Sequence, residues 1–144
     1  MKTRPRVLDT SVVVKWFSCA DENDLEKSLM LRQEHIENPG MFVIPDLLYY
    51  ELANALRYNP RFSSKDAVMA MDSLFKLDIE TKSVTSESIR TAVSLAYEKN
   101  ITVYDACFLA LAQELGGVLI TADYSFFKKV ESDNFVQKLS DLRL

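Results

Sequence analysis

Strand-like apolar runs alternate with amphipathic segments along the whole chain. Five short runs have the composition and polar boundaries of strands, and the last of them is the weakest. They span Arg6–Leu8, Met41–Ile44, Asp78–Lys82, Val118–Ala122 and Asn134–Leu139. Because segments at helical spacing separate them, we expect an α/β protein. Its mostly parallel central sheet would have about five strands, flanked by helices on both faces.

Helical spacing of apolar residues between these runs predicts five helices. The first is marked by Leu25, Leu29 and Ile36, and the second by Leu47, Leu48, Leu52, Ala55 and Leu56. The third follows a capping box at Ser63-Ser64-Lys65-Asp66 and carries Ala67, Ala70, Met71, Leu74 and Phe75. The fourth carries Ile89, Ala92, Val93, Ala96 and Tyr97, and ends at Lys99 and Asn100. The fifth begins near Asp105 and stops at Gly116-Gly117, where glycine allows a left-handed end.

The length and composition of the chain suit one domain. Its 144 residues are 48% hydrophobic, which is enough to build one core without disulfides or structural zinc. Three glycines and four prolines are too few to mark a linker, and no repeat or low-complexity tract divides the chain. We therefore expect a single domain over residues 1–144.

The charge balance limits how this chain meets nucleic acid. Its formal net charge of −4 disfavours adhesion through bulk charge, so any such contact must be local. Cys19, Cys107 and the single His35 are too few for a zinc site or a disulfide framework, which fits a reducing cytoplasm. The apolar residues after Met1–Arg6 meet Asp9 at once, so we expect no signal peptide. No run approaches the ~20 apolar residues of a membrane span.

Four acidic residues interrupt or directly follow apolar runs: Asp9, Glu51, Asp105 and Asp123. Asp9 and Asp123 each follow a predicted strand, so they would lie at the carboxyl edge of a parallel sheet, where the binding crevice of such folds lies. If those two strands are neighbours, the two carboxylates meet.

The other two acids admit a structural explanation as well. Asp105 begins a helix, where the helix dipole and capping would account for it alone. Glu51 has Leu47, Leu48 and Ala55 at helical spacing, so it points toward the core, although a rotated helix would leave it in solvent.

A cluster of four carboxylates stays ionised near neutral pH only with a cation present, because like charges repel and raise one another's pKa. Oxygen ligands favour Mg²⁺ or Mn²⁺ over zinc. A site of this kind suits metal-assisted hydrolysis of a phosphodiester, which requires no nucleophilic side chain. The chain carries no G-x-S-x-G elbow, P-loop, G-x-G-x-x-G or His-rich zinc motif that would favour another chemistry.

Four segments resemble the PIN-domain nucleases, and among them the VapC-like toxins of toxin–antitoxin pairs: VLDTSVVVKWF, PDLLYYELANAL, TVYDACFLALA and GGVLITADYSFF. The family's acidic motifs match Asp9 with Ser11, Glu51 with Asn54, Asp105, and Asp123 with Thr121. The resemblance implies a Mg²⁺- or Mn²⁺-dependent endoribonuclease that forms a homodimer. It also implies a VapB-like antitoxin whose tail covers the acidic crevice.

The resemblance further implies a role for each matched residue. Asp9, Asp105 and Asp123 would hold the metal, and Glu51 would hold it through water or complete the shell. Ser11, Asn54 and Thr121 would orient the carboxylates or the substrate phosphate. Thr121 is equally explained as a β-branched strand residue, and Asn54 as exposed helix surface.

Several surface residues are candidates for contact with RNA or a partner. The basic candidates are Lys15, Arg57, Arg61, Lys65, Lys128 and Lys129, and the aromatic candidates are Tyr49, Tyr50, Tyr58 and Tyr104. Dimer packing is an alternative use for the Tyr49-Tyr50 pair. The helices over Leu25–Ile36 and Leu47–Tyr58 would form a groove for an antitoxin helix, unless their apolar residues serve the core.

Three other functions compete with a nuclease. A haloacid-dehalogenase phosphatase needs an acid two residues after the first, where this chain has Ser11. A signalling receiver needs an acidic pair beside the first strand, where Asp9 stands alone. A catalytically weak PIN-like protein that binds RNA or a partner usually loses acids that this chain keeps.

Overall fold

The structure, a computed structural model, describes residues 4–18 and 23–143. Its strands form one sheet in the order β3-β2-β1-β4-β5, and every neighbouring pair is parallel. The strands are β1 (Arg6–Leu8), β2 (Phe42–Pro45), β3 (Glu80–Lys82), β4 (Val118–Thr121) and β5 (Val136–Lys138). The predicted α/β class and parallel sheet are confirmed, with strand ends within two residues of those expected.

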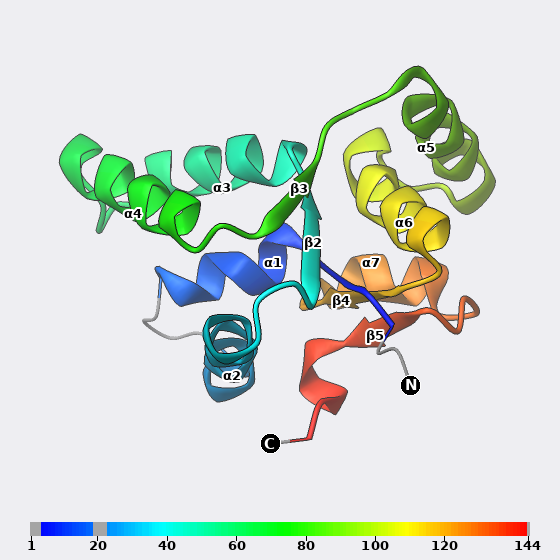
Figure 1. The fold of residues 1–144 in the computed structure, drawn as a ribbon. Coiled ribbons are helices and arrows are strands. Elements are labelled where there is room, and N and C mark those ends of the chain that lie inside the picture. The colour runs from blue at the N-terminus through cyan, green and yellow to red at the C-terminus, as the bar shows by residue number, and fades with distance from the viewer. Residues whose placement is uncertain (1–3, 19–22, 144) are drawn as a thin grey trace.

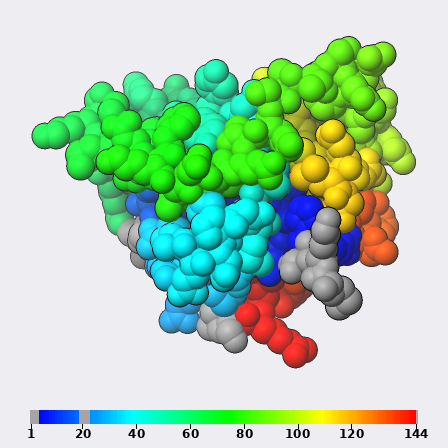
Figure 2. Space-filling model, in the orientation of Figure 1, coloured from blue at the N-terminus to red at the C-terminus, as the bar shows by residue number. Residues whose placement is uncertain are grey.

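Helices cover both faces of the sheet (Figure 1). One face carries α1 (Thr10–Val13), the 3-10 turn η1 (Val14–Trp16), α2 (Leu25–Glu37), α3 (Leu47–Arg57) and α4 (Ser64–Lys76). The other carries α5 (Ser86–Lys99), α6 (Val103–Leu115) and α7 (Tyr124–Val130), and a second 3-10 turn, η2 (Leu139–Asp141), follows β5. On the face shown in Figure 2, part of the N-terminal segment (dark blue) is visible between the cyan, yellow and red parts of the chain.

The order of the strands reverses between β1 and β4. The chain runs outward from β1 to β2 and β3, then crosses the sheet to β4 and continues to β5. Leu8 pairs with Ile120, and the backbone N–H of Asp9 donates to the Ile120 carbonyl at 3.0 Å. The carboxyl ends of β1 and β4 are therefore neighbours at the switch point, where open parallel sheets have their binding crevice. The expected meeting of these strand ends is confirmed.

Several helix ends follow signals in the sequence. Ser63 caps α4 and forms the predicted capping box with Asp66. Asn100 ends α5 at a φ of 55°, and Gly116 ends α6 at a φ of 61°, both in the left-handed region. Gly117 has a different constraint, because a Cβ there would lie 2.3 Å from the Pro5 carbonyl oxygen. Only glycine lets β4 start this close to the segment that leads into β1.

The buried face of α2 is not the predicted stripe of Leu25, Leu29 and Ile36. Its buried residues are Ser28, Leu31 and His35, while Ile36 is 51% exposed. Hydrogen bonds make the polar residues acceptable in the interior. The Ser28 hydroxyl donates to the Val12 carbonyl at 2.8 Å, and His35 Nε2 pairs with the Leu77 carbonyl.

The predicted stripe on α5 is also only partly buried. Ala92, Leu95 and Ala96 are buried on the helix, which packs against α6. Ile89, Val93 and Tyr97 are exposed, as is Phe75 at the end of α4. Two alanines of the predicted stripe and Leu95, which was not part of it, therefore form the buried face of α5, and the larger apolar residues of the stripe stay at the surface.

Some predictions fall outside the described residues or stay predictions. Cys19 and the first half of Met1–Arg6 lie outside them. The single domain over residues 1–144 stays a prediction. Within the described part of the chain, no helix is both long and apolar enough to cross a membrane.

Candidate active site

Two hydroxyl groups hold Asp9 at the end of β1. The residue is only 7% exposed. Its Oδ2 accepts hydrogen bonds from Ser11 Oγ at 2.6 Å and from Thr121 Oγ1 at 2.8 Å. Buried carboxylates require such donors or a cation, because an unpaired buried charge is costly. Asp9 is thus compensated by neutral hydroxyls in the part of the chain that the structure describes.

The same hydroxyls are tied to the start of α7. Ser11 Oγ accepts from the Ala122 backbone N–H at 2.9 Å, and Thr121 Oγ1 accepts from the Asp123 backbone N–H at 3.0 Å. Because each hydroxyl oxygen already accepts a backbone N–H, its own proton is directed to Asp9. The network therefore joins the end of β1 to the end of β4 and fixes the orientation of the Asp9 carboxylate.

Glu51 reaches the site from α3. Its Oε1 accepts a hydrogen bond of 2.7 Å from Thr10 Oγ1, in the first turn of α1. The side chain is half-buried, so it does not take the fully solvated position of a rotated helix. Sequence reasoning did not select Thr10. Its position directly after Asp9, in Asp-Thr-Ser, was the available signal.

Asp105 lies in the first turn of α6, and Asp123 directly precedes α7. Thr102 caps α6, with its hydroxyl accepting from the Asp105 backbone N–H at 3.0 Å, so capping does not explain the Asp105 side chain. Asp123 caps α7, and its Oδ1 accepts from the Phe126 backbone N–H at 3.0 Å. Asp123 therefore has a structural role that the sequence reasoning did not assign.

Burial and electrostatic repulsion link Asp105 to the other three carboxylates. Burial raises the pKa of Asp105 to about 6, together with the negative charges of Asp9, Asp123 and Glu51. Burial also raises the pKa of Asp9, and Asp123 adds to it, although the Ser11 and Thr121 hydroxyls lower it. The pKa of Glu51 is raised by burial and by Asp9, against the Thr10 hydrogen bond. All four side chains thus act on one region.

The donor set fits a hard divalent cation held in an open site. Carboxylate oxygens suit Mg²⁺ and Mn²⁺, and a cation would relieve the repulsion that raises these pKa values. Among the described residues, no three acidic, histidine or cysteine side chains form a ready metal cage. Mg²⁺ commonly keeps several waters and uses one or two carboxylates together with substrate phosphates, so a closed cage is not required.

A polar hollow lies beside the acids. It has a volume of about 420 Å³, and its lining includes Asp105, Asp123, Thr102 and Lys129. The Lys129 ammonium donates to the Asn100 carbonyl at 3.2 Å, which holds it at the edge of the hollow. A positive charge therefore lines the same hollow as two of the four carboxylates, where an incoming phosphate would be attracted.

The other candidate residues differ in how exposed they are. Asn54 is exposed on α3, and its side chain makes no hydrogen bond to the four acids in the described structure. Lys15 is buried, so the expectation that it contacts RNA at the surface is wrong. Arg57 lies over the Tyr58 ring, 5.1 Å from its centroid. The remaining basic candidates are exposed: Arg61, Lys65 and Lys128.

Comparisons with known proteins identify a family and a relative. Residues 6–132 match the family model of the PIN domain. Ribonuclease VapC3 of Pyrobaculum aerophilum is 33% identical over 88 residues, which are 58% of this chain and 67% of that protein.

Solved structures share the fold. A toxin–antitoxin complex from Klebsiella pneumoniae aligns with a TM-score of 0.68 at 17% identity, over 95% of this chain and 99% of the other. VapC20 of Mycobacterium tuberculosis, described as a sarcin–ricin loop cleaving toxin, aligns with a TM-score of 0.64 at 16% identity. That alignment spans 84% of this chain and 93% of the other.

We predict that Asp105→Asn changes how stability depends on pH when divalent metal is chelated. The pKa of Asp105 lies at about 6 in the folded chain, above its ordinary value of 3.8, so the folded state binds more protons between these values. Stability of the wild type therefore falls as the pH rises through this window. Because solvent screens this half-exposed carboxylate, the expected loss is about 1 kcal/mol.

Urea unfolding at about pH 4 and about pH 7 measures the effect. From the lower to the higher pH, the free energy of unfolding of the variant should rise by about 1 kcal/mol relative to that of the wild type. Asp72→Asn, on the exposed side of α4, is the matched control and should follow the wild type. Equal pH dependence in all three proteins would contradict the placement of Asp105 among like charges.

Proposed function

We propose that this chain, which belongs to the PIN-domain family, is an endoribonuclease that hydrolyses RNA phosphodiester bonds with Mg²⁺ or Mn²⁺. The observation that carries the proposal is the position of Asp105, where burial and the charges of three other carboxylates raise its pKa to about 6. The 33% identical relative is named a ribonuclease, which supports RNA as the substrate. The proposed biological role is that of the toxin in a toxin–antitoxin pair.

Each acid has a proposed task. Asp9, Asp105 and Asp123 would hold the cation, and Glu51 would complete its shell directly or through water. When bound, the cation polarises a phosphoryl oxygen, lowers the pKa of a water molecule and stabilises charge on the attacking and leaving oxygens.

Neighbouring side chains position these acids. Ser11 and Thr121 keep the Asp9 carboxylate in one orientation through their hydrogen bonds. Thr10 does the same for Glu51, which lies on a different helix. Asp105 would still carry part of its proton near neutral pH and would lose it when a cation arrives. Asn54 is exposed, so its proposed task is to orient the substrate phosphate rather than a carboxylate.

The proposed partner is a VapB-like antitoxin. The similar Klebsiella chain comes from a toxin–antitoxin complex, which supports this kind of partner. Apolar side chains for an antitoxin helix are exposed on α3, directly after it and on α4: Tyr50, Tyr58, Val68, Met69 and Phe75. The predicted groove between α2 and α3 offers less, because Leu48, Leu52 and Leu56 of α3 are buried in the core.

A homodimer, expected from the resemblance, is part of the proposal, as is a cytoplasmic location. Dimer packing by the Tyr49-Tyr50 pair stays part of the proposal, although one face of the Tyr49 ring stacks on Phe75 of the same chain with centroids 4.3 Å apart. Tyr50 is exposed beside it.

We predict that Asp9→Asn abolishes metal-dependent RNA cleavage while the fold is retained. Asparagine can keep hydrogen bonds to the site, but it lacks the charge that holds a cation. Purified protein is incubated with mixed RNAs in Mg²⁺, Mn²⁺ or chelator, and circular dichroism checks the fold. Asp72→Asn, which removes an exposed carboxylate from α4, should cleave like the wild type.

Retained cleavage by Asp9→Asn in a clean preparation would contradict the ligand role. If the wild type binds RNA but cleaves none in either metal, the chain is instead a catalytically weak PIN-like binding protein.

Lys129 should contact the RNA backbone at the polar hollow. We predict that Lys129→Gln weakens RNA binding and reduces the slope of log affinity against log salt by about 1, as expected for one lost phosphate contact. Lys128→Gln is the matched control, because Lys128 is exposed on the same helix but does not line the hollow. Fluorescence anisotropy over a salt series, with Asp9→Asn as background, measures both slopes. Identical slopes for the two variants would remove Lys129 from the interface.

A further inference from the structure

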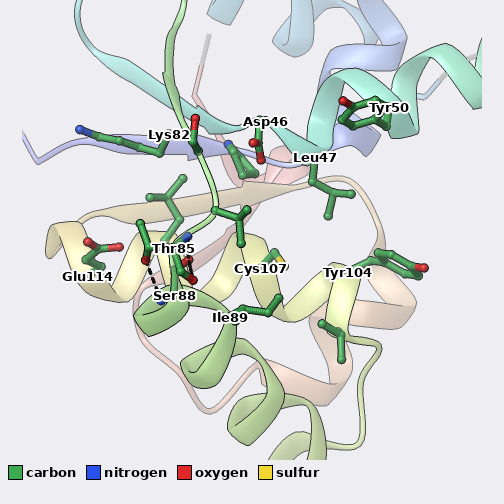
Figure 3. Close-up of a pocket in the computed structure, with 15 residues that line it drawn as sticks. Asp46, Leu47, Tyr50, Lys82, Thr85, Ser88, Ile89, Tyr104, Cys107 and Glu114 are labelled. Carbon is green, nitrogen blue, oxygen red and sulfur yellow. Dashed lines mark hydrogen bonds between the residues drawn. The ribbon is translucent and has the colours of Figure 1, made fainter.

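A second, larger cavity lies beside the acidic site. It has a volume of about 490 Å³ and is enclosed by the start of α3, the segment between β3 and α5, and the helices α5 and α6 (Figure 3). Its walls are mainly apolar, with side chains from Leu47, Val84, Ile89, Val103, Cys107 and Leu111. A concave apolar pocket with a few polar groups is the usual form of a site for a small organic group.

Two lining residues are direct neighbours of the candidate metal ligands. Tyr50 precedes Glu51 on α3, and Tyr104 precedes Asp105 on α6. Cys107, two residues after Asp105 on α6, also lines the cavity. The cavity and the acids are therefore close enough to share one substrate.

The tyrosines offer free aromatic faces. Tyr50 is 75% exposed and Tyr104 is 62% exposed. Both lie at the same end of the cavity in the view of Figure 3, with α3 above and α6 below. Exposed aromatic rings next to a nuclease site are suited to stack on unpaired bases, because every base has a π-face.

The charges of the cavity select against a phosphate. Asp46 and Glu114 line it, while the lining cation, Lys82, is already paired with Glu80 at 3.4 Å. A phosphate would be repelled by the two carboxylates, whereas a neutral ring would not. Carboxylates also accept hydrogen bonds from the exocyclic amino groups of bases. The cavity therefore suits an aromatic, uncharged group that can donate hydrogen bonds.

We propose that this cavity, flanked by Tyr50 and Tyr104, binds one unpaired nucleobase next to the bond that is cut. The inference rests on the proposed function and adds to it a preference for single-stranded RNA with an amino-bearing base at a fixed distance from the cleaved bond. Tyr104 and Tyr50 stack on the base, and Asp46 accepts from its amino group. The four acids act on the adjacent phosphodiester.

Abasic RNA tests the inference directly. The cut is first mapped on a single-stranded RNA, and oligonucleotides are then made with one abasic nucleotide at each position around it. For one position, loss of the base should raise KM about fivefold to a hundredfold, the range of one lost stacking contact. With intact RNA, Tyr104→Ala should raise KM by a similar factor. With the abasic RNA, it should add little more, because both changes remove the same contact.

Control variants separate the pocket from general effects. Tyr97→Ala removes a tyrosine that is 87% exposed on α5 but does not line the cavity, and it should leave KM unchanged. Asp46→Asn should reduce the preference for an amino-bearing base over uracil. Independent effects of Tyr104→Ala and the abasic position, or no effect at any position, would overturn the inference.

Measurements of the oligomeric state and of RNA affinity complete the test. Sedimentation velocity of the wild type and of Tyr104→Ala tests whether a second copy of the chain fills the cavity. In that case the variant would dissociate, and this result would also overturn the inference. The same abasic series is measured for affinity with Asp9→Asn, where the same position should weaken binding. Absence of cleavage by the wild type would refute the proposed function, while the affinity measurements would still decide what the cavity holds.

Discussion

Repulsion among four carboxylates is the constraint on which the site depends. Asp9 and Asp123 are brought together because β1 and β4 are neighbours where the strand order reverses. Glu51 and Asp105 then arrive on helices from opposite faces of the sheet. Burial, together with the charges of the other three acids, raises the pKa of Asp105 to about 6. A fold that keeps such a cluster carries an electrostatic cost that a bound cation would remove.

Neutral hydroxyls make the arrangement tolerable without a cation. Ser11 and Thr121 satisfy Asp9 and are themselves fixed by backbone N–H groups at the start of α7. Thr10 holds Glu51 in the same way. Such contacts fix the side chains before substrate arrives, which lowers the cost of ordering them during the reaction. The hydroxyls compensate only part of the burial, so the pKa of Asp9 remains raised.

The sequence was sufficient to predict what depends on local signals. Strand runs, the capping box at Ser63 and the left-handed ends at Asn100 and Gly116 involve short stretches, and each appears in the structure. The sequence also predicted that Asp9 and Asp123 lie at one edge of the sheet, because each of them directly follows a predicted parallel strand. The buried face of α2 did not follow, because Ser28 and His35 are accepted only through bonds to distant carbonyls. The hydrogen bond from Thr10 to Glu51 and the cavity near Tyr104 could not be predicted either, because each needs helices that are distant in the sequence to pack together.

Calorimetric titration of the wild type with Mn²⁺ tests the central claim most directly. The titration is run at about pH 6 in buffers of different ionisation enthalpy, which gives the number of protons released on binding. The account predicts saturable binding with release of at least about half a proton, because Asp105 has a pKa of about 6. Protons released by the neighbouring carboxylates would add to this number. Binding without proton release, or no saturable binding, would contradict the convergence of these carboxylates on a cation.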